Sequence, residues 1–120
     1  MTAAPRRSTP MLTIVLTGRR PVRIQAAEWP KIANVGDIVQ DVGDDGTLRS
    51  HALQSWMLTV RQHADGRTLV YGTRMSNIAG GESLMAGEDL IASIHRVAAL
   101  IAAPNLALEC IAALPPEELG

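Results

Sequence analysis

The chain contains very few aromatic side chains. It has no phenylalanine, and its only aromatic residues are Trp29, Trp56 and Tyr71. Many proteins that bind single-stranded nucleic acids stack the bases on several aromatic rings. The scarcity of such rings argues against a stacking platform of that kind, and it leaves Ala, Leu, Ile and Val to form the hydrophobic core.

Cysteine is almost as scarce, because Cys110 is the only one in the chain. A single thiol excludes an internal disulfide and a cysteine-based zinc cluster, and it suits a reducing cytoplasm. Cys110 stands in a helical pattern of apolar residues. We therefore interpret it as a small buried hydrophobe and not as a nucleophile.

Long apolar runs are also lacking. No stretch approaches the roughly 20 apolar residues that cross a bilayer, and the first ten residues, MTAAPRRSTP, hold no apolar signal core. We therefore expect no membrane span, no secretion and a cytoplasmic location. The formal net charge of −1 predicts no strong overall electric field.

The length of 120 residues suits one domain. Residues 1–10 are polar and include two prolines and two arginines, so we interpret them as a disordered tail. Residues 11–120 are then expected to form a single domain, because the sequence has neither an internal repeat nor a linker of the kind that separates domains.

The stretch WMLTVRQHADGRTLVYGTR is the most regular part of the chain. Apolar residues alternate with others on both sides of an Asp-Gly pair, which predicts two strands joined by a tight turn. With Asp65 and Gly66 as the two turn residues, Val60 pairs with Tyr71, and we prefer this register. It gathers four residues on one face: Leu58, Val60, Leu69 and Tyr71. A three-residue loop would shift the register by one and place Val70 there instead.

Shorter elements are expected before this hairpin. Pro21 favours an edge position for the strand that it begins, because proline cannot donate to a ladder. Pro30 limits any helix around it, because proline is accepted only in the first turn. The upstream pattern predicts, in order, a strand over 11–17, a short strand over 22–24, a short helix within 25–35, a strand over 37–42 and a turn over 43–46.

The period changes after the hairpin. Residues 76–87 are rich in small residues and predict a loop. Apolar residues at helical spacing from Leu90 to Ile101 predict an amphipathic helix. Asn105 is a good cap for a second helix, which Pro115 would end.

Strands therefore come first along the chain and helices last, which is typical of α+β domains. We expect an antiparallel sheet of about four to five strands, with the C-terminal helical pair packed on one face.

The sequence offers little catalytic chemistry. His51, His63 and His95 share no metal-ligand spacing within one element, so we interpret them as structural, although folding could bring distant residues together. Gly80 and Gly81 are not followed by the Gly-Lys-Ser/Thr of a phosphate loop. No serine stands in a nucleophile-elbow context. We therefore predict no catalytic constellation, no metal and no cofactor.

The acidic stretch DVGDDG invites comparison with an EF-hand calcium loop. Counting from Asp41, Gly46 stands where that loop has its glycine. The third position is Gly43 and the twelfth is Ala52, so the bidentate glutamate is missing. We interpret the stretch as an acidic turn.

Charge is distributed unevenly along the chain. The first 31 residues carry six basic side chains opposed only by Glu28. The stretch DVGDDG and the helical C-terminal part that follow are acidic. A basic hairpin could meet phosphates, a polarised surface could steer docking to a protein, and charge could simply keep the surface solvated. The candidate partner-binding residues are Arg19, Arg20 and Arg23 on the basic turn, or Asp41, Asp44 and Asp45 on the acidic one.

Three segments, TIVLTGRRPVRI, AEWPKIA and LTVRQHADGRTLVYG, resemble segments of small uncharacterised proteins encoded by phages and other mobile elements of proteobacteria. The resemblance covers residues 13 to about 72. It implies a compact protein that modulates host machinery, a class that includes inhibitors of CRISPR effectors. The motifs are structural, so the resemblance implies no functional residue.

We therefore predict a small non-catalytic protein-binding module, an anti-CRISPR-like inhibitor of a host protein complex in the bacterial cytoplasm. Two alternatives remain open. One is a nucleic-acid-associated accessory protein that uses the basic hairpin, and the other is a small enzyme or ligand-binding domain. Self-association is compatible with all three.

Overall fold

The computed structural model of the protein describes residues 10–42, 48–74 and 77–117, with the backbone path alone for 37–42 and 48–55. Within these residues, six strands and a short 3-10 helix precede two α-helices. In chain order these are β1 (Met11–Ile14), β2 (Val22–Gln25), η1 (Ala26–Glu28), β3 (Lys31–Val42), β4 (Leu48–Gln62), β5 (Thr68–Arg74), β6 (Asn77–Leu84), α1 (Leu90–Leu100) and α2 (Leu106–Ala113).

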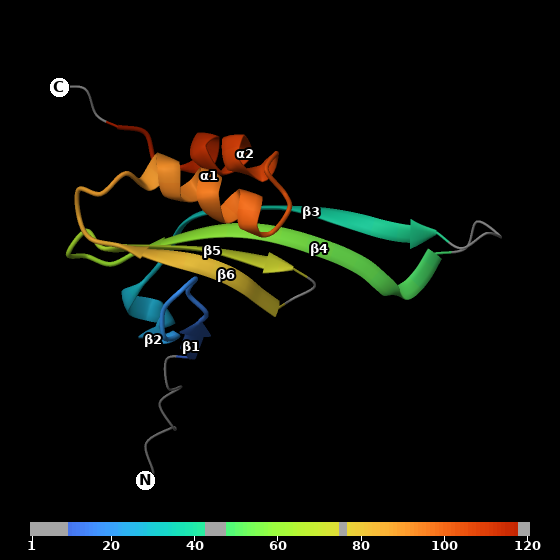
Figure 1. The fold of residues 1–120 in the computed structure, drawn as a ribbon, viewed down its shortest axis with the longest axis horizontal. Helices are drawn as coiled ribbons and strands as arrows, with labels where there is room; N and C mark the ends of the chain where they lie inside the picture. Colours follow the sequence, from blue (N-terminus) through green and yellow to red (C-terminus); the bar gives the residue numbers. More distant parts are fainter. Residues whose placement is uncertain (1–9, 43–47, 75–76, 118–120) are drawn as a thin grey trace, which may run out of the picture.

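The predicted α+β fold is confirmed. Strands β3, β4, β5 and β6 form an antiparallel four-stranded sheet in that order, and β1 and β2 form a separate antiparallel pair. Both helices pack on one face of the large sheet, and the β1–β2 hairpin lies under the opposite face (Figure 1). The prediction of a domain over 11–120 stays a prediction, and residues 1–9 lie outside the described part.

Successive side chains of the central strands point to opposite faces of the sheet, and a hydrophobic cluster forms on each face. Leu58, Val60 and Val70 belong to the cluster that faces the helices. Leu69 and Tyr71 belong to a second cluster with residues of the β1–β2 hairpin. Burying one large aliphatic side chain contributes about 1.5–3 kcal/mol, so each layer is fixed by several such contacts.

The register preferred from the sequence is wrong by one residue. Val60 pairs with Val70, and the loop has three residues, 64–66. The backbone N–H of Gly66 donates to the His63 carbonyl at 2.9 Å, and Gly66 has a φ of +94°. A tight turn followed by a left-handed glycine makes a three-residue loop, which moves Val70 to the helix side.

Two further sequence predictions are corrected. Residues 77–84 form strand β6 and not a loop; a Cβ on Gly81 would lie 2.6 Å from the Val70 carbonyl oxygen, so the small residue permits close strand pairing there. The helix expected within 25–35 is only the three-residue η1. Pro30 follows it, and β3 begins at Lys31.

The hairpin layer is attached to the edge of the large sheet. The backbone N–H of Thr17 donates to the Gly81 carbonyl at 2.9 Å. The Gln62 N–H donates to the Pro30 carbonyl at 3.1 Å, beside the point where η1 passes into β3. These contacts bring β2 and η1 against the β4–β5 turn, where the candidate site lies.

Candidate functional site: a cationic hollow beside β2

Trp29 is the centre of a small cluster that includes the His63 imidazole and the Arg67 guanidinium. The indole is 7 % exposed. The His63 ring lies 5.1 Å from it, tilted by 53°, and the Arg67 guanidinium lies 5.1 Å from the ring centroid. A cation over an indole face gains about 0.5–1 kcal/mol at an exposed site. Trp29 therefore orients two cation-forming side chains from the β4–β5 turn.

A buried arginine holds the backbone of Trp29 in place. Arg61 is 7 % exposed. Its Nη1 donates to the Trp29 carbonyl at 2.9 Å and its Nε donates to the Tyr71 hydroxyl at 2.8 Å. These contacts link the end of η1 to the central strands β4 and β5.

Asp65 orients Arg67 from within the hairpin loop. Its Oδ2 accepts from Arg67 Nε at 2.7 Å and its Oδ1 accepts from the Arg67 backbone N–H at 3.0 Å. The backbone hydrogen bond from Arg67 is the main reason that the pKa of Asp65 lies below its usual value. The Nε atom of Arg67 is thus engaged, while its two terminal nitrogens make no hydrogen bond within the described part of the chain.

His63 also meets Asp65. Its Nδ1 lies 3.1 Å from Asp65 Oδ1 and 3.2 Å from the Asp65 backbone nitrogen. Nδ1 either donates to the carboxylate or accepts from the N–H, so the two contacts belong to different protonation forms of the ring. In the accepting form, the neutral ring carries its proton on Nε2, which is then a donor.

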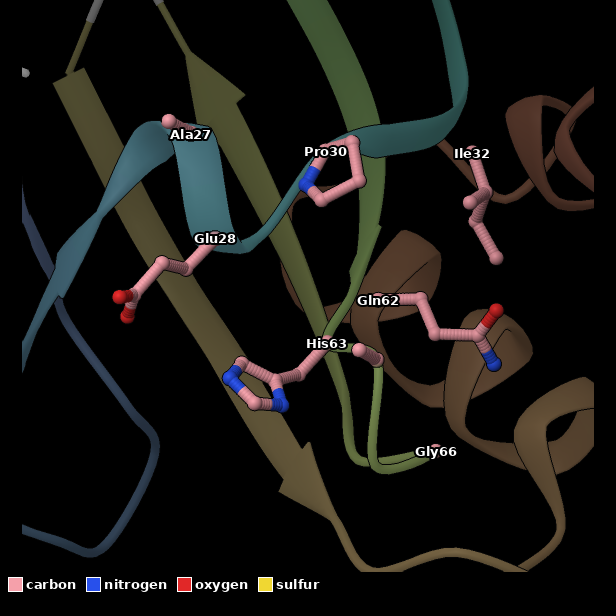
Figure 2. Close-up of a pocket in the computed structure, with 8 residues that line it drawn as sticks. Ala27, Glu28, Pro30, Ile32, Gln62, His63 and Gly66 are labelled. Carbon is pink, nitrogen blue, oxygen red and sulfur yellow. The ribbon is translucent and has the colours of Figure 1, made fainter.

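Two hollows adjoin this cluster and share Glu28 and His63. The first, of about 610 Å³, lies between η1 and the β4–β5 turn (Figure 2). The second, of about 500 Å³, runs along β2. Arg23 and Arg67 border the second hollow, together with apolar side chains that include Val22 and Ile24.

The predicted basic residues lie on this side of the molecule. Arg19 and Arg20 are exposed in the turn between β1 and β2, and Arg23 is exposed on β2. Arg23 is the member of this group that borders the hollow.

Of the three predicted acidic residues, only Asp41 belongs to the described part of the chain. Asp41 is near the end of β3, far along the β3–β4 ribbon from the β1–β2 hairpin (Figure 1). Asp44 and Asp45 lie outside the described residues, between two strands and not between the helices of an EF-hand. Of the predicted residues that the structure describes, Arg23 borders the second hollow and Asp41 does not.

Sequence reasoning missed Trp29, His63 and Arg67 as parts of one site. Trp29 is more than 30 residues from the other two in the chain, so only the tertiary fold brings them together. The one local signal was the Asp65–Arg67 spacing, which suits a side-chain contact across a tight turn.

The helix side of the sheet has the opposite charge. A third hollow, of about 420 Å³, is bordered by Glu88, Asp89 and Glu117. Arg96, on α1, is bound by Glu82, with Arg96 Nη2 and Glu82 Oε1 2.8 Å apart.

Other candidate chemistry is not assembled in the part of the chain that the structure describes. Cys110 is fully buried, and burial raises the pKa of its thiol to about 11, so the thiol is protonated at neutral pH. Across residues 10–42, 48–74 and 77–117, no group of three His, Cys, Asp or Glu residues is placed to hold a metal ion. His95 is exposed on α1, away from His63.

Comparison of the chain with models of known families, with curated proteins and with solved structures finds no match. Within the described residues, neither α1 nor α2 has the length and apolar character needed to cross a membrane.

Proposed function

We propose that the protein is a small non-catalytic binding module that docks on an acidic surface of a host protein or complex. Docking uses the basic layer formed by the β1–β2 hairpin and the β4–β5 turn. The resemblance of its sequence segments to mobile-element proteins supports a bacterial cytoplasmic partner, and an RNA-guided nuclease complex is one member of that class.

The observation that carries this proposal is the separation of charge across the sheet. Arg19, Arg20, Arg23 and Arg67 lie on the hairpin side, where the acidic residues include Glu28 and Asp65, the latter paired with Arg67. The helix side carries exposed acidic residues, namely Glu88, Asp89, Glu109 and Glu117. Its Arg96 is paired with Glu82, and its Arg74 lies over the Trp56 ring. A chain with almost no net charge thus presents two oppositely charged surfaces, and charge complementarity of this kind steers the approach of a partner.

The aromatic residues favour a protein partner over a nucleic acid. Trp29 and Tyr71 are 7 % and 6 % exposed, and the Trp29 ring is flanked by Arg67 and His63. Trp56 is half-buried with Arg74 lying 5.7 Å from its ring. These rings pack against other side chains of the protein, whereas binding of a single-stranded nucleic acid needs exposed ring faces on which bases can stack.

The test is affinity capture from a bacterial lysate with quantitative mass spectrometry. The bait is the full chain, and it is compared with a variant carrying Arg19→Glu, Arg20→Glu and Arg23→Glu. We expect one complex to be enriched by the wild type and to be lost with the variant, although the variant keeps its melting temperature. The matched control reverses charge on the other side, with Glu88→Lys, Glu109→Lys and Glu117→Lys, and should retain the complex.

Two results would contradict the proposal. One is equal capture by both triple variants and the wild type. The other is capture that disappears after nuclease treatment, which would instead support the nucleic-acid alternative.

A further inference from the structure

Strand β2 has one edge that no other described strand pairs with. Within the described residues it pairs only with β1. The Ala26 N–H donates to the Pro10 carbonyl at 3.0 Å, just beyond the pairs Met11–Gln25 and Leu12–Ile24. Hydrogen-bonded and non-bonded pairs alternate along an antiparallel ladder. The N–H and C=O groups of Arg23 and the N–H of Gln25 therefore face away from β1, whereas the Gln25 C=O, at the N-cap of η1, accepts the first hydrogen bond of that helix.

The open edge borders the hollow of about 500 Å³. All four residues of β2, from Val22 to Gln25, contribute to its lining. Successive side chains of a strand point to opposite faces, so a hollow that contacts all four lies along the edge of the strand. The facing wall includes His63, Arg67 and Leu69.

The charges around this hollow define what it would accept. Arg23 and Arg67 contribute two guanidinium groups, and the exposed Arg19 and Arg20 continue the positive charge along the hairpin. Glu28 is the single acidic residue of the lining, at the boundary with the neighbouring hollow. Apolar side chains, among them Ile24 and Leu69, lie between the charged groups. An extended segment that alternates acidic and apolar residues matches this pattern.

We propose that β2 binds an extended acidic segment of the partner protein as an added β-strand. The partner backbone pairs with the outward N–H and C=O groups of Arg23 and with the outward N–H of Gln25, and an acidic side chain pairs with the terminal nitrogens of Arg67, which make no hydrogen bond within the described residues. Main-chain pairing supplies affinity in this mode of recognition and side-chain contacts supply selectivity. The inference rests on the proposed docking function and names the chemistry of the docked segment.

Gln25→Pro tests the backbone pairing without removing a charge. Proline deletes the outward N–H and leaves the β1–β2 ladder intact, and the Gln25 φ of −85° is close to the value of about −65° that proline requires. An edge strand tolerates such a residue. Gln25→Ala keeps the N–H and is the matched control.

The probe is a fluorescein-labelled peptide of alternating valine and glutamate, read by fluorescence anisotropy against the full chain and by amide chemical shifts of the ¹⁵N-labelled protein. We expect shifts on β2 and on residues 63–67. We expect binding about fivefold weaker for Gln25→Pro, as for the loss of one main-chain hydrogen bond, and a similar weakening for Arg67→Gln. Gln25→Ala should bind like the wild type.

The inference is overturned if the peptide shifts no β2 amide, if Gln25→Pro binds as well as Gln25→Ala, or if a lysine–valine peptide or an oligothymidylate binds the same amides more tightly. Its failure is separable from failure of the docking proposal. A partner that is captured equally by wild type and Gln25→Pro refutes strand addition alone. If the wild type captures no specific partner, both proposals are refuted.

Discussion

The guanidinium of Arg61 donates from Nη1 to the carbonyl oxygen of Trp29 at 2.9 Å, and the indole ring of the same residue lies 5.1 Å from the Arg67 guanidinium. This contact couples the buried side of β4 to the cationic hollow, because it fixes the backbone of the residue on which the surface arginine rests. The stability of the fold and the geometry of the site are thus linked through Trp29.

Replacing Arg61 with methionine should destabilise the protein by about 2 kcal/mol, because the Trp29 carbonyl and the Tyr71 hydroxyl both lose a charged donor. Urea unfolding measures the change. Arg74→Met is the control, since Arg74 is exposed over Trp56, and it should change stability by no more than about 0.5 kcal/mol. Equal effects of the two substitutions would contradict the anchoring role of Arg61.

The three-residue hairpin loop makes a prediction about Gly66. Gly66→Ala forces a side chain into a left-handed conformation, at a cost of about 1–2 kcal/mol, and its Cβ would lie 2.9 Å from the Ala86 Cβ. Gly87 has a similar φ of +88° but has no atom within 4 Å of a Cβ built there. In thermal unfolding, Gly66→Ala should therefore cost more than Gly87→Ala, and adding Ala86→Gly should recover the difference. A Gly66→Ala protein as stable as the wild type would refute the loop assignment.

The end of α1 offers a stabilising substitution. Ala102 has a φ of +60°, its N–H donates to the Ala99 carbonyl and the Ala103 N–H donates to the Ala98 carbonyl, both at 3.0 Å. This is the Schellman arrangement, in which glycine is the preferred residue at the left-handed position. Ala102→Gly should raise the free energy of unfolding by about 0.5–1 kcal/mol. Ala99→Gly, within the helix, should lower it by a similar amount, and a loss of stability in both would contradict the assignment.

The hydrogen bonds to the Glu82 carboxylate should make the stability of the protein depend on pH. Hydrogen bonds from Arg96, aided by one from Ser93, hold the pKa of Glu82 below its ordinary value of 4.5. The folded protein thus binds fewer protons at this site than the unfolded chain, so the stabilisation is complete above about pH 4.5 and is lost as the pH falls through the lowered value.

Glu82→Gln should therefore lower the melting temperature at pH 7 and have a much smaller effect near pH 3. Glu117→Gln, on an exposed residue after α2, should leave stability nearly unchanged at both pH values. A deficit of Glu82→Gln that is as large at pH 3 as at pH 7 would rule out the carboxylate contacts as its cause.

Local patterns were sufficient to predict the type of most elements. The helical spacing before Pro104 and Pro115 located α1 and α2, because proline is not accepted beyond the first turn of a helix. The order of strands and helices gave the α+β class. The sequence also predicts the β1–β2 hairpin, but not its position under the sheet. Alternation in 11–17 indicates which residues are buried, but it does not indicate which element packs against them.

The failures have a common physical cause. Gly66 sets the register through a left-handed backbone, and sequence alone does not distinguish two-residue from three-residue loops around Asp-Gly. The sequence predicts a loop at Gly80 and Gly81, although close packing requires both glycines in β6, Gly81 against β5 and Gly80 against Leu100 of α1. Trp29, His63 and Arg67 meet only through tertiary contacts, so neither composition nor spacing could reveal the hollow that they support.

The most direct test of the account is the association rate of the captured partner as a function of salt concentration. We expect the wild-type rate to fall steeply between about 50 and 300 mM salt, as for steered association. The Arg19→Glu, Arg20→Glu, Arg23→Glu variant should associate at least about tenfold more slowly at low salt. A wild-type rate that is independent of salt and equal to that of the variant would contradict docking through the basic layer.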